Sequence, residues 1–392
     1  MFFLGLVSFF TDISTEMVYP LIPLFLSLEF GAGPALIGII EGIAESLASL
    51  LKVYSGYLSD RFQKKKALAF AGYAVSLACK LVLLIAGSWA WVLFARVLDR
   101  FGKGIRTAPR DVLVSESADR NKMGNAFGLH KALDMAGSAL GIFITWCILR
   151  EMSAVGTENS FPYKSVFMIS IIPAILGLSM FFFIKQKEGI KKEAKPRFAF
   201  WQNFRKMNTQ LQLYLCVVFL FTLGNSSNAF LLLKAYKTGF DKTDTILLYF
   251  VYSAAASVLS VPFGRLSDSI GRKKLLVPGY FLFSICYLGF AFASSQTFMV
   301  CAFVVYGVFT AMITGVERAY VAEIAPAALK GTMLGLQSTV VGLALFPASV
   351  ITGFLWENFG DIIPFAFGAF TAFAAAMILV LFMKRADDGV IE

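Results

Sequence analysis

The sequence predicts an all-α membrane protein in which twelve transmembrane helices form two pseudo-symmetric six-helix bundles. Of its 392 residues, 58% are hydrophobic and only 15% are charged, and the mean hydropathy is +0.72, which exceeds the apolar share of ordinary soluble domains. The apolar stretches are long and continuous, and a bilayer core about 30 Å thick needs roughly 20 such residues per helix. Two segments of the first half also reappear, in the same order, in the second half.

Twelve apolar stretches, separated by charged or Gly- and Pro-rich breaks, are the predicted helices. They cover residues 2–28, 35–58, 67–87, 89–115, 122–149, 163–185, 209–235, 243–265, 275–293, 297–322, 330–355 and 361–384. The first stretch resembles the apolar region of a signal peptide, but it has neither a basic leading segment nor a small-residue cleavage site, and it continues to Leu28. We therefore expect it to be the first transmembrane helix.

One long hydrophilic connection divides these helices six and six. It predicts an N-terminal bundle over 1–185, a cytoplasmic linker over 186–208 and a C-terminal bundle over 209–392. Lys and Arg concentrate in the loops on the same side as this linker, and such residues are retained in the cytoplasm during insertion. We expect a multi-pass protein of the cytoplasmic (inner) membrane with both termini inside, so that the net charge of +10 reports topology rather than a nucleic-acid partner.

The sequence lacks the catalytic, metal-binding and nucleotide-binding motifs that were sought. It has a single histidine and no G-x-S-x-G, H-E-x-x-H or nucleotide-binding P-loop pattern, so we expect neither an enzyme, nor a cofactor, nor a metal centre. The cysteines stand singly in apolar stretches and are expected to pack as small apolar residues; they are Cys79, Cys147, Cys216, Cys286 and Cys301.

The internal repeat links the two halves. GYLSDRFQKKKAL at 56–68 returns as GRLSDSIGRKKLL at 264–276, and ESADRNKMGNAFGL at 116–129 returns as EIAPAALKGTMLGL at 323–336 at nearly the same offset. These matches indicate a duplicated six-helix unit, and an even number of helices per unit makes the repeats parallel.

The repeated loop, the twelve stretches and the central linker together resemble the major facilitator superfamily of secondary transporters, along the whole chain. The resemblance implies that the loops form a cytoplasmic latch, which breaks as the halves rock against each other. We expect its two glycines to allow a neighbouring helix to approach closely. The implied latch residues are Gly56, Asp60, Arg61, Gly264, Asp268 and Arg272, with Glu116 and Glu323 as acidic partners.

Charged residues at mid-membrane depth are the candidate site. Such charges are costly and either line a water-filled cavity or pair with one another. In the first half they are Asp12, Glu16, Glu41, Glu45, Lys80, Arg96, Asp99, Arg100, Lys103, His130, Lys131 and Asp134, and the second half offers neutral polar groups that include Asn225, Asn228 and Gln337.

Specific roles can be assigned to some of these groups. Arg96 resembles the helix-4 arginine that is associated with proton transfer in proton-coupled members of the family. Arg100 needs a carboxylate partner or a solvated anion at this depth, and the candidate resting partners are Asp12 and Glu16. His130 is a candidate proton relay beside Asp134, one turn away. Each charge could instead belong to a static buried pair.

The predicted function is secondary active transport by alternating access, coupled to protons, of an anionic or zwitterionic organic solute such as a carboxylate or a siderophore. The partners are then the small-molecule substrate, protons and membrane lipid, with no nucleic acid, and the chain is expected to act as a monomer. The alternatives are proton-coupled multidrug efflux, transport of a metal cation, and a non-transporting membrane receptor.

Overall fold

The computed structural model describes residues 2–62, 65–116, 123–154, 163–184, 209–325 and 330–383, and all secondary structure in these ranges is helical. The predicted linker, 186–208, lies outside them. The first half comprises α1 (Phe2–Val18), η1 (Tyr19–Leu21), α2 (Ile22–Phe30), α3 (Pro34–Phe62), α4 (Lys65–Leu84), α5 (Trp89–Glu116), α6 (Met123–Ala154), α7 (Tyr163–Ser179) and η3 (Met180–Phe183). The second half comprises α9 (Thr209–Gly224), α10 (Ala229–Lys237), α11 (Lys242–Ile270), α12 (Arg272–Phe292), α13 (Gln296–Ile313), α14 (Val316–Ile324), α15 (Lys330–Phe359) and α16 (Ile362–Phe382).

These segments form the twelve crossings that the apolar pattern predicts. Eleven of them, within the described part of the chain, are long and apolar enough to cross a membrane. The remaining crossing is α5, which carries a row of charged residues along its length.

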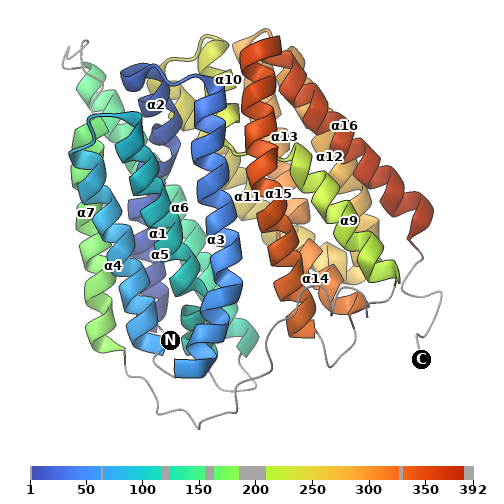
Figure 1. Ribbon diagram of the computed structural model, residues 1–392, viewed down its shortest axis with the longest axis horizontal. Coiled ribbons are helices and arrows are strands. Elements are labelled where there is room, and N and C mark those ends of the chain that lie inside the picture. Colours follow the sequence, from blue (N-terminus) through green and yellow to red (C-terminus); the bar gives the residue numbers. More distant parts are fainter. Residues whose placement is uncertain are drawn as a thin grey trace.

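The crossings gather into two bundles (Figure 1). Helices α1 to α7 lie on one side of the molecule and α9 to α16 on the other, and α1 begins at the end of the molecule toward which α16 descends. Within the first bundle α1 packs against α6 and α7, and α4 packs against α5. In the second, α12 packs against α16 and α11 against α13. The bundles meet mainly along α3 and α15, and also along α6 and α11.

Glycines bring α3 and α15 into backbone contact. A Cβ atom at Gly38 would overlap the Ser349 carbonyl oxygen, and one at Gly42 would lie 3.0 Å from the carbonyl oxygen of Phe346. Further along this seam the Ser46 hydroxyl donates a hydrogen bond of 2.6 Å to a carbonyl oxygen of α15. Small residues allow membrane helices to approach in this way. The contact therefore runs from the α2–α3 connection to the middle of the molecule.

Three of the crossings are interrupted. The first bends through η1, where Pro20 and Pro23 stand at the starts of η1 and α2. The seventh and tenth were expected to be continuous, but they break at 225–228 and at Thr314–Gly315. The Asn and Ser side chains of residues 225–228 compete with the helix for backbone hydrogen bonds. Gly315 has a φ of +87°, a conformation that residues with a Cβ atom rarely adopt.

The second bundle has an aromatic interior. The rings of Phe221 and Tyr280 stack with centroids 4.0 Å apart, and those of Phe283 and Tyr287 stack at 3.9 Å. Aromatic pairs in offset geometry add to the stability gained from buried area. Polar chemistry is consequently concentrated in the first bundle.

Candidate functional site

A row of cations follows one face of α5. They recur every three or four residues, which places them on one side of the helix, and they are Arg96, Arg100, Lys103, Arg106 and Arg110. Arg96, Arg100 and Arg106 are at most 4% exposed. A buried guanidinium is tolerated only when carboxylates or other acceptors surround it. The partners of this row therefore define the site.

Arg96 forms the tightest pair. Its Nε donates to Glu41 Oε1 over 2.9 Å and its NH2 group donates to Glu41 Oε2 over 2.6 Å. Glu41 is 1% exposed, so both charges are removed from solvent. Two parallel, charge-assisted hydrogen bonds are the geometry in which a buried ion pair is most stable.

Arg100 is paired with Glu45, 3.1 Å away, and lies 3.9 Å from Asp99. The expectation that Asp12 or Glu16 is its ion-pair partner is therefore wrong. Helices α3 and α5 pack along their length, which brings Glu45, one turn beyond Glu41, within reach of Arg100. Asp99 faces Lys80 at 3.8 Å.

An aromatic ring underlies both guanidinium groups. The Tyr19 ring centroid is 5.0 Å from the guanidinium carbon of Arg96 and 5.3 Å from that of Arg100. Tyr19 belongs to η1, so the bend in the first crossing supplies this cation–π contact. A small cavity of about 10 Å³ adjoins Arg96 and Asp99 and is bordered by Thr15, Tyr19, Lys80 and Leu83.

Glu41 also reaches the second bundle. The Ser227 hydroxyl, in the break of the seventh crossing, donates to Glu41 Oε2 over 3.1 Å. The Ser227 amide donates to Ser349 Oγ over 3.4 Å. Half-buried Asn225 and Asn228 occupy the same break, and Asn228 Oδ1 accepts a hydrogen bond from Tyr306 at 2.9 Å. The polar break thus joins the ion-pair cluster to the aromatic interior.

Gln337 is placed elsewhere. It is buried in α15, its Oε1 makes no hydrogen bond among the described residues, and none of the described contacts joins it to the ion pairs.

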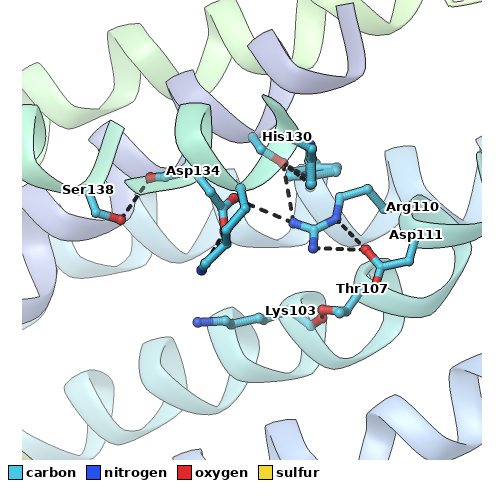
Figure 2. A network of polar contacts seen from close by, with 10 residues as sticks. Lys103, Thr107, Arg110, Asp111, His130, Asp134 and Ser138 are labelled. Atoms are coloured by element: carbon cyan, nitrogen blue, oxygen red, sulfur yellow. Dashed lines mark hydrogen bonds and ion pairs between the residues drawn. The ribbon is translucent and has the colours of Figure 1, made fainter. Parts of the chain in front are cut away.

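A second cluster lies further along α5 (Figure 2). Arg110 donates from Nε and NH2 to Asp111 Oδ1 over 3.1 and 3.0 Å, and its NH1 group donates to Ser8 Oγ over 3.2 Å. The same NH1 group lies 3.7 Å from Asp134. His130 Nε2 is 3.3 Å from Ser8 Oγ. His130 and Asp134 are therefore linked through Ser8 and Arg110.

Three charged side chains lie between the two clusters and are not ion-paired within 4.0 Å among the described residues. Lys103 is half-buried on α5, and Figure 2 shows its ammonium group with no contact drawn to it. Its charged neighbours include Asp12 and Glu16, half-buried on α1. The Asp12 carboxyl lies close to that of Asp134.

Three of the residues expected to form a latch contact one another in the second copy of the repeat. Arg272 NH1 is 2.7 Å from Glu323 Oε2 and 3.2 Å from the Ala319 carbonyl oxygen, and Arg272 NH2 is 3.5 Å from Asp268. Gly264 does not bring helices together, because a Cβ there would meet no atom within 4 Å. The side chains of the first copy, Gly56, Asp60, Arg61 and Glu116, lie outside the described part of the structure.

Tyr19, Arg110 and Ser227 belong to these clusters but were not among the predicted site residues. The spacing of cations on α5 continues from Arg96 to Arg110, and this periodicity is a signal that could have identified Arg110. No comparable signal marks Tyr19, whose role depends on the bend at η1. Within the described ranges, no group of three or more His, Cys, Asp or Glu side chains is arranged to hold a metal ion.

Comparison with known proteins agrees with this architecture. The sequence model of the major facilitator superfamily matches residues 4–240 and 213–390. An uncharacterized MFS-type transporter of Methanocaldococcus jannaschii is 33% identical over 385 residues, covering 97% of this chain and 94% of the relative. A multidrug resistance efflux pump of Streptococcus pneumoniae is 25% identical over 303 residues, covering 74% and 72%. A crystal structure of a nucleoside transporter superposes with a TM-score of 0.82 at 12% identity, covering 98% of this chain and 99% of that one. The chain therefore belongs to the major facilitator superfamily and is a multi-pass membrane transporter, not an enzyme.

Proposed function

We propose that this secondary transporter couples the movement of protons to that of a small organic solute that carries a carboxylate, alone or with an amine. The observation that supports this proposal is that some charged side chains of the site are ion-paired and others are not. Arg96 and Arg100 are held by carboxylates, whereas Lys103, Asp12 and Glu16 have no ion-pair partner among the described residues. Unpaired charges at this depth need a ligand or a proton.

Lys103 is the proposed anchor for the solute carboxylate. It is half-buried, so it is both partly desolvated and reachable, and an ammonium in such a position gains from a charge-assisted hydrogen bond. An amine on the solute would meet Asp12 or Glu16 on the facing helix.

Protons enter through the same carboxyl groups. While Asp12 and Glu16 are ionised, they attract Lys103 and repel a solute carboxylate. Protonation removes both effects, so that the solute and the proton bind together. The carboxyl pair of Asp12 and Asp134 extends the proton site toward the cluster around Arg110.

The arrangement of the halves supports alternating access. If both termini are cytoplasmic, as we propose, the α3–α15 seam closes the outer end of the molecule. The hydrogen bond from Ser227 to Glu41 then belongs to the closed state of that end, and breaking it accompanies outward opening.

The test uses Lys103→Gln, with Lys164→Gln as a control that removes an exposed charge at the start of α7. Thermal-shift titrations with small carboxylates, zwitterions and amphiphilic cations identify a ligand class. We expect Lys103→Gln to weaken carboxylate binding by about 1–3 kcal/mol, the scale of a hydrogen bond to a charged group. Equal carboxylate binding by the wild type and Lys103→Gln would contradict the proposed anchor.

Coupling is tested in proteoliposomes that contain a pH-sensitive dye. Asp12→Asn and Glu16→Gln should abolish proton movement driven by the solute while leaving solute binding in place. Uptake that follows a sodium gradient and ignores a collapsed proton gradient would remove proton coupling.

Efflux of amphiphilic cations is the second candidate. It is favoured by the similarity to the streptococcal efflux pump and by the position of Glu16, which lies near the hydroxyls of Tyr249 and Tyr252. The centroids of these two rings lie 5.3 Å apart. This function predicts binding that is lost in Asp12→Asn or Glu16→Gln and unchanged in Lys103→Gln.

A further inference from the structure

Glu317 is a carboxylate of the second bundle that lies beside its aromatic interior. It lies in the first turn of α14, directly after the break at Thr314–Gly315, and it is half-buried. The site proposed above is in the first bundle and makes no use of this residue.

Tyrosines surround the Glu317 carboxylate. The Tyr280 hydroxyl, on α12, donates to Glu317 Oε1 over 2.7 Å. Tyr214, on α9, is fully buried, contacts the Tyr320 ring with centroids 4.9 Å apart, and its hydroxyl makes no hydrogen bond of good geometry among the described residues. A buried hydroxyl without a partner is costly, so this group is an unused donor or acceptor beside the carboxyl.

No cation neutralises Glu317 within 4.0 Å in the described part of the chain. Arg272, which packs against α14 from α12, is occupied by Glu323 and Asp268. Arg318 follows Glu317 in the sequence but is exposed. The other titratable or charged side chains that the structure describes on α14 and on the elements packed against it are Lys273, Lys274, Tyr320, Tyr287, Tyr306, Glu357, Cys216, Cys286 and Cys301.

A half-buried carboxyl that has a hydroxyl partner but no cation can hold a proton and still exchange it with water. The Tyr214 hydroxyl lies near that of Tyr280 and offers it a further donor or acceptor. The helix break beside it allows α14 to move separately from α13, because Gly315 alone bears the φ of +87° at that joint. We propose that Glu317, together with Tyr280 and Tyr214, is a proton-binding site of the second bundle that loads and releases one proton as α14 moves.

Infrared difference spectroscopy of the purified protein tests this proposal without requiring transport. Spectra taken across the neutral pH range should contain a protonated-carboxyl C=O band that Glu317→Gln removes. Glu29→Gln, which deletes an exposed carboxyl at the end of α2, should retain the band. Bands from Asp12, Glu16 and Asp134 are common to all three proteins and cancel when variants are compared. If the wild-type and Glu317→Gln spectra contain the same protonated-carboxyl bands, the proposal is overturned.

Tyr280→Phe provides a second readout if Glu317→Gln does not fold. Loss of the 2.7 Å hydrogen bond strengthens the C=O bond, so the same band should move to higher frequency. An unmoved band would show that the titrating carboxyl is another residue. Because neither result depends on a substrate, failure of this proposal can be distinguished from failure of the function proposed for Lys103.

Discussion

The ion pair of Arg96 and Glu41 is buried, so the stability of the protein depends on both side chains being present. Removing one partner of a buried ion pair leaves the other charge without compensation, which costs about 3–5 kcal/mol. We expect Glu41→Gln to lower the free energy of unfolding in detergent by that amount, measured by denaturant titration. The double variant Glu41→Gln/Arg96→Gln should recover part of the loss, because neither charge of this pair is then left buried without the other. If both variants lose the same stability, the pair is not the cause.

Asp361 has a simpler environment, between α15 and α16. Lys234 Nζ and Lys237 Nζ lie 2.5 and 2.6 Å from its two carboxylate oxygens. Partial burial disfavours the charged form, but the hydrogen bonds from the two lysines outweigh this effect and lower the pKa of Asp361 to about 2.

This pKa determines a pH dependence. Because it lies below the ordinary value of 3.8, the interaction contributes stability that is complete above that pH and is lost as the pH falls through about 2. Melting temperatures measured over this range should fall more steeply for the wild type than for Asp361→Asn. Parallel curves for the two proteins would show that Asp361 has no part in acid unfolding.

At the scale of the helix, the seam between α3 and α15 depends on residues without side chains. Gly38→Val would place methyl groups against the Ser349 backbone, so the two helices must separate. We expect spin labels at Glu29 and Asn358, both exposed, to show longer distances in this variant by pulsed electron resonance. Gly335→Ala, on α15 where a Cβ meets open space, should leave the distances unchanged. Equal distances in Gly38→Val would mean that the seam adapts without opening.

The helices themselves could largely be predicted from the sequence, because hydrophobic stretches report span length directly. The breaks at 225–228 and Thr314–Gly315 could not, since both lie in apolar surroundings that read as continuous helix. The charged residues of the site were also predictable, because charge is rare at this depth. Their partners were not: whether Arg100 meets Glu16 or Glu45 depends on the rotation and tilt of α3 and α5, which no single sequence encodes visibly.

The two halves of the whole molecule communicate through few polar contacts. The hydrogen bond from Ser227 to Glu41 joins them at the centre, so Ser227→Ala should weaken the closed arrangement by about 0.5–1.5 kcal/mol. This corresponds to a shift of roughly twofold to tenfold in the ratio of the two states. The same spin-label distances measure the shift.

Ser260→Ala is the matched control, because its hydroxyl bonds to Ala256 within one helix. A shift of equal size in both variants would show that the loss of any serine hydroxyl is enough, and that the contact between the halves is not special.

The charged face of α5 also has a consequence for how the protein is made. A Lys or Arg near the centre of an isolated membrane helix disfavours insertion by about 2.5–3.5 kcal/mol, and α5 carries several. Alone it would not be expected to leave the translocation channel for lipid. Its neutralising carboxylates, Glu41 and Glu45, belong to α3, which is synthesised earlier. We therefore expect α3 to remain next to the translocation channel until α5 has been synthesised, and the two helices to enter the bilayer together. The ion pairs between them would then form during biosynthesis, before the second half of the chain is synthesised.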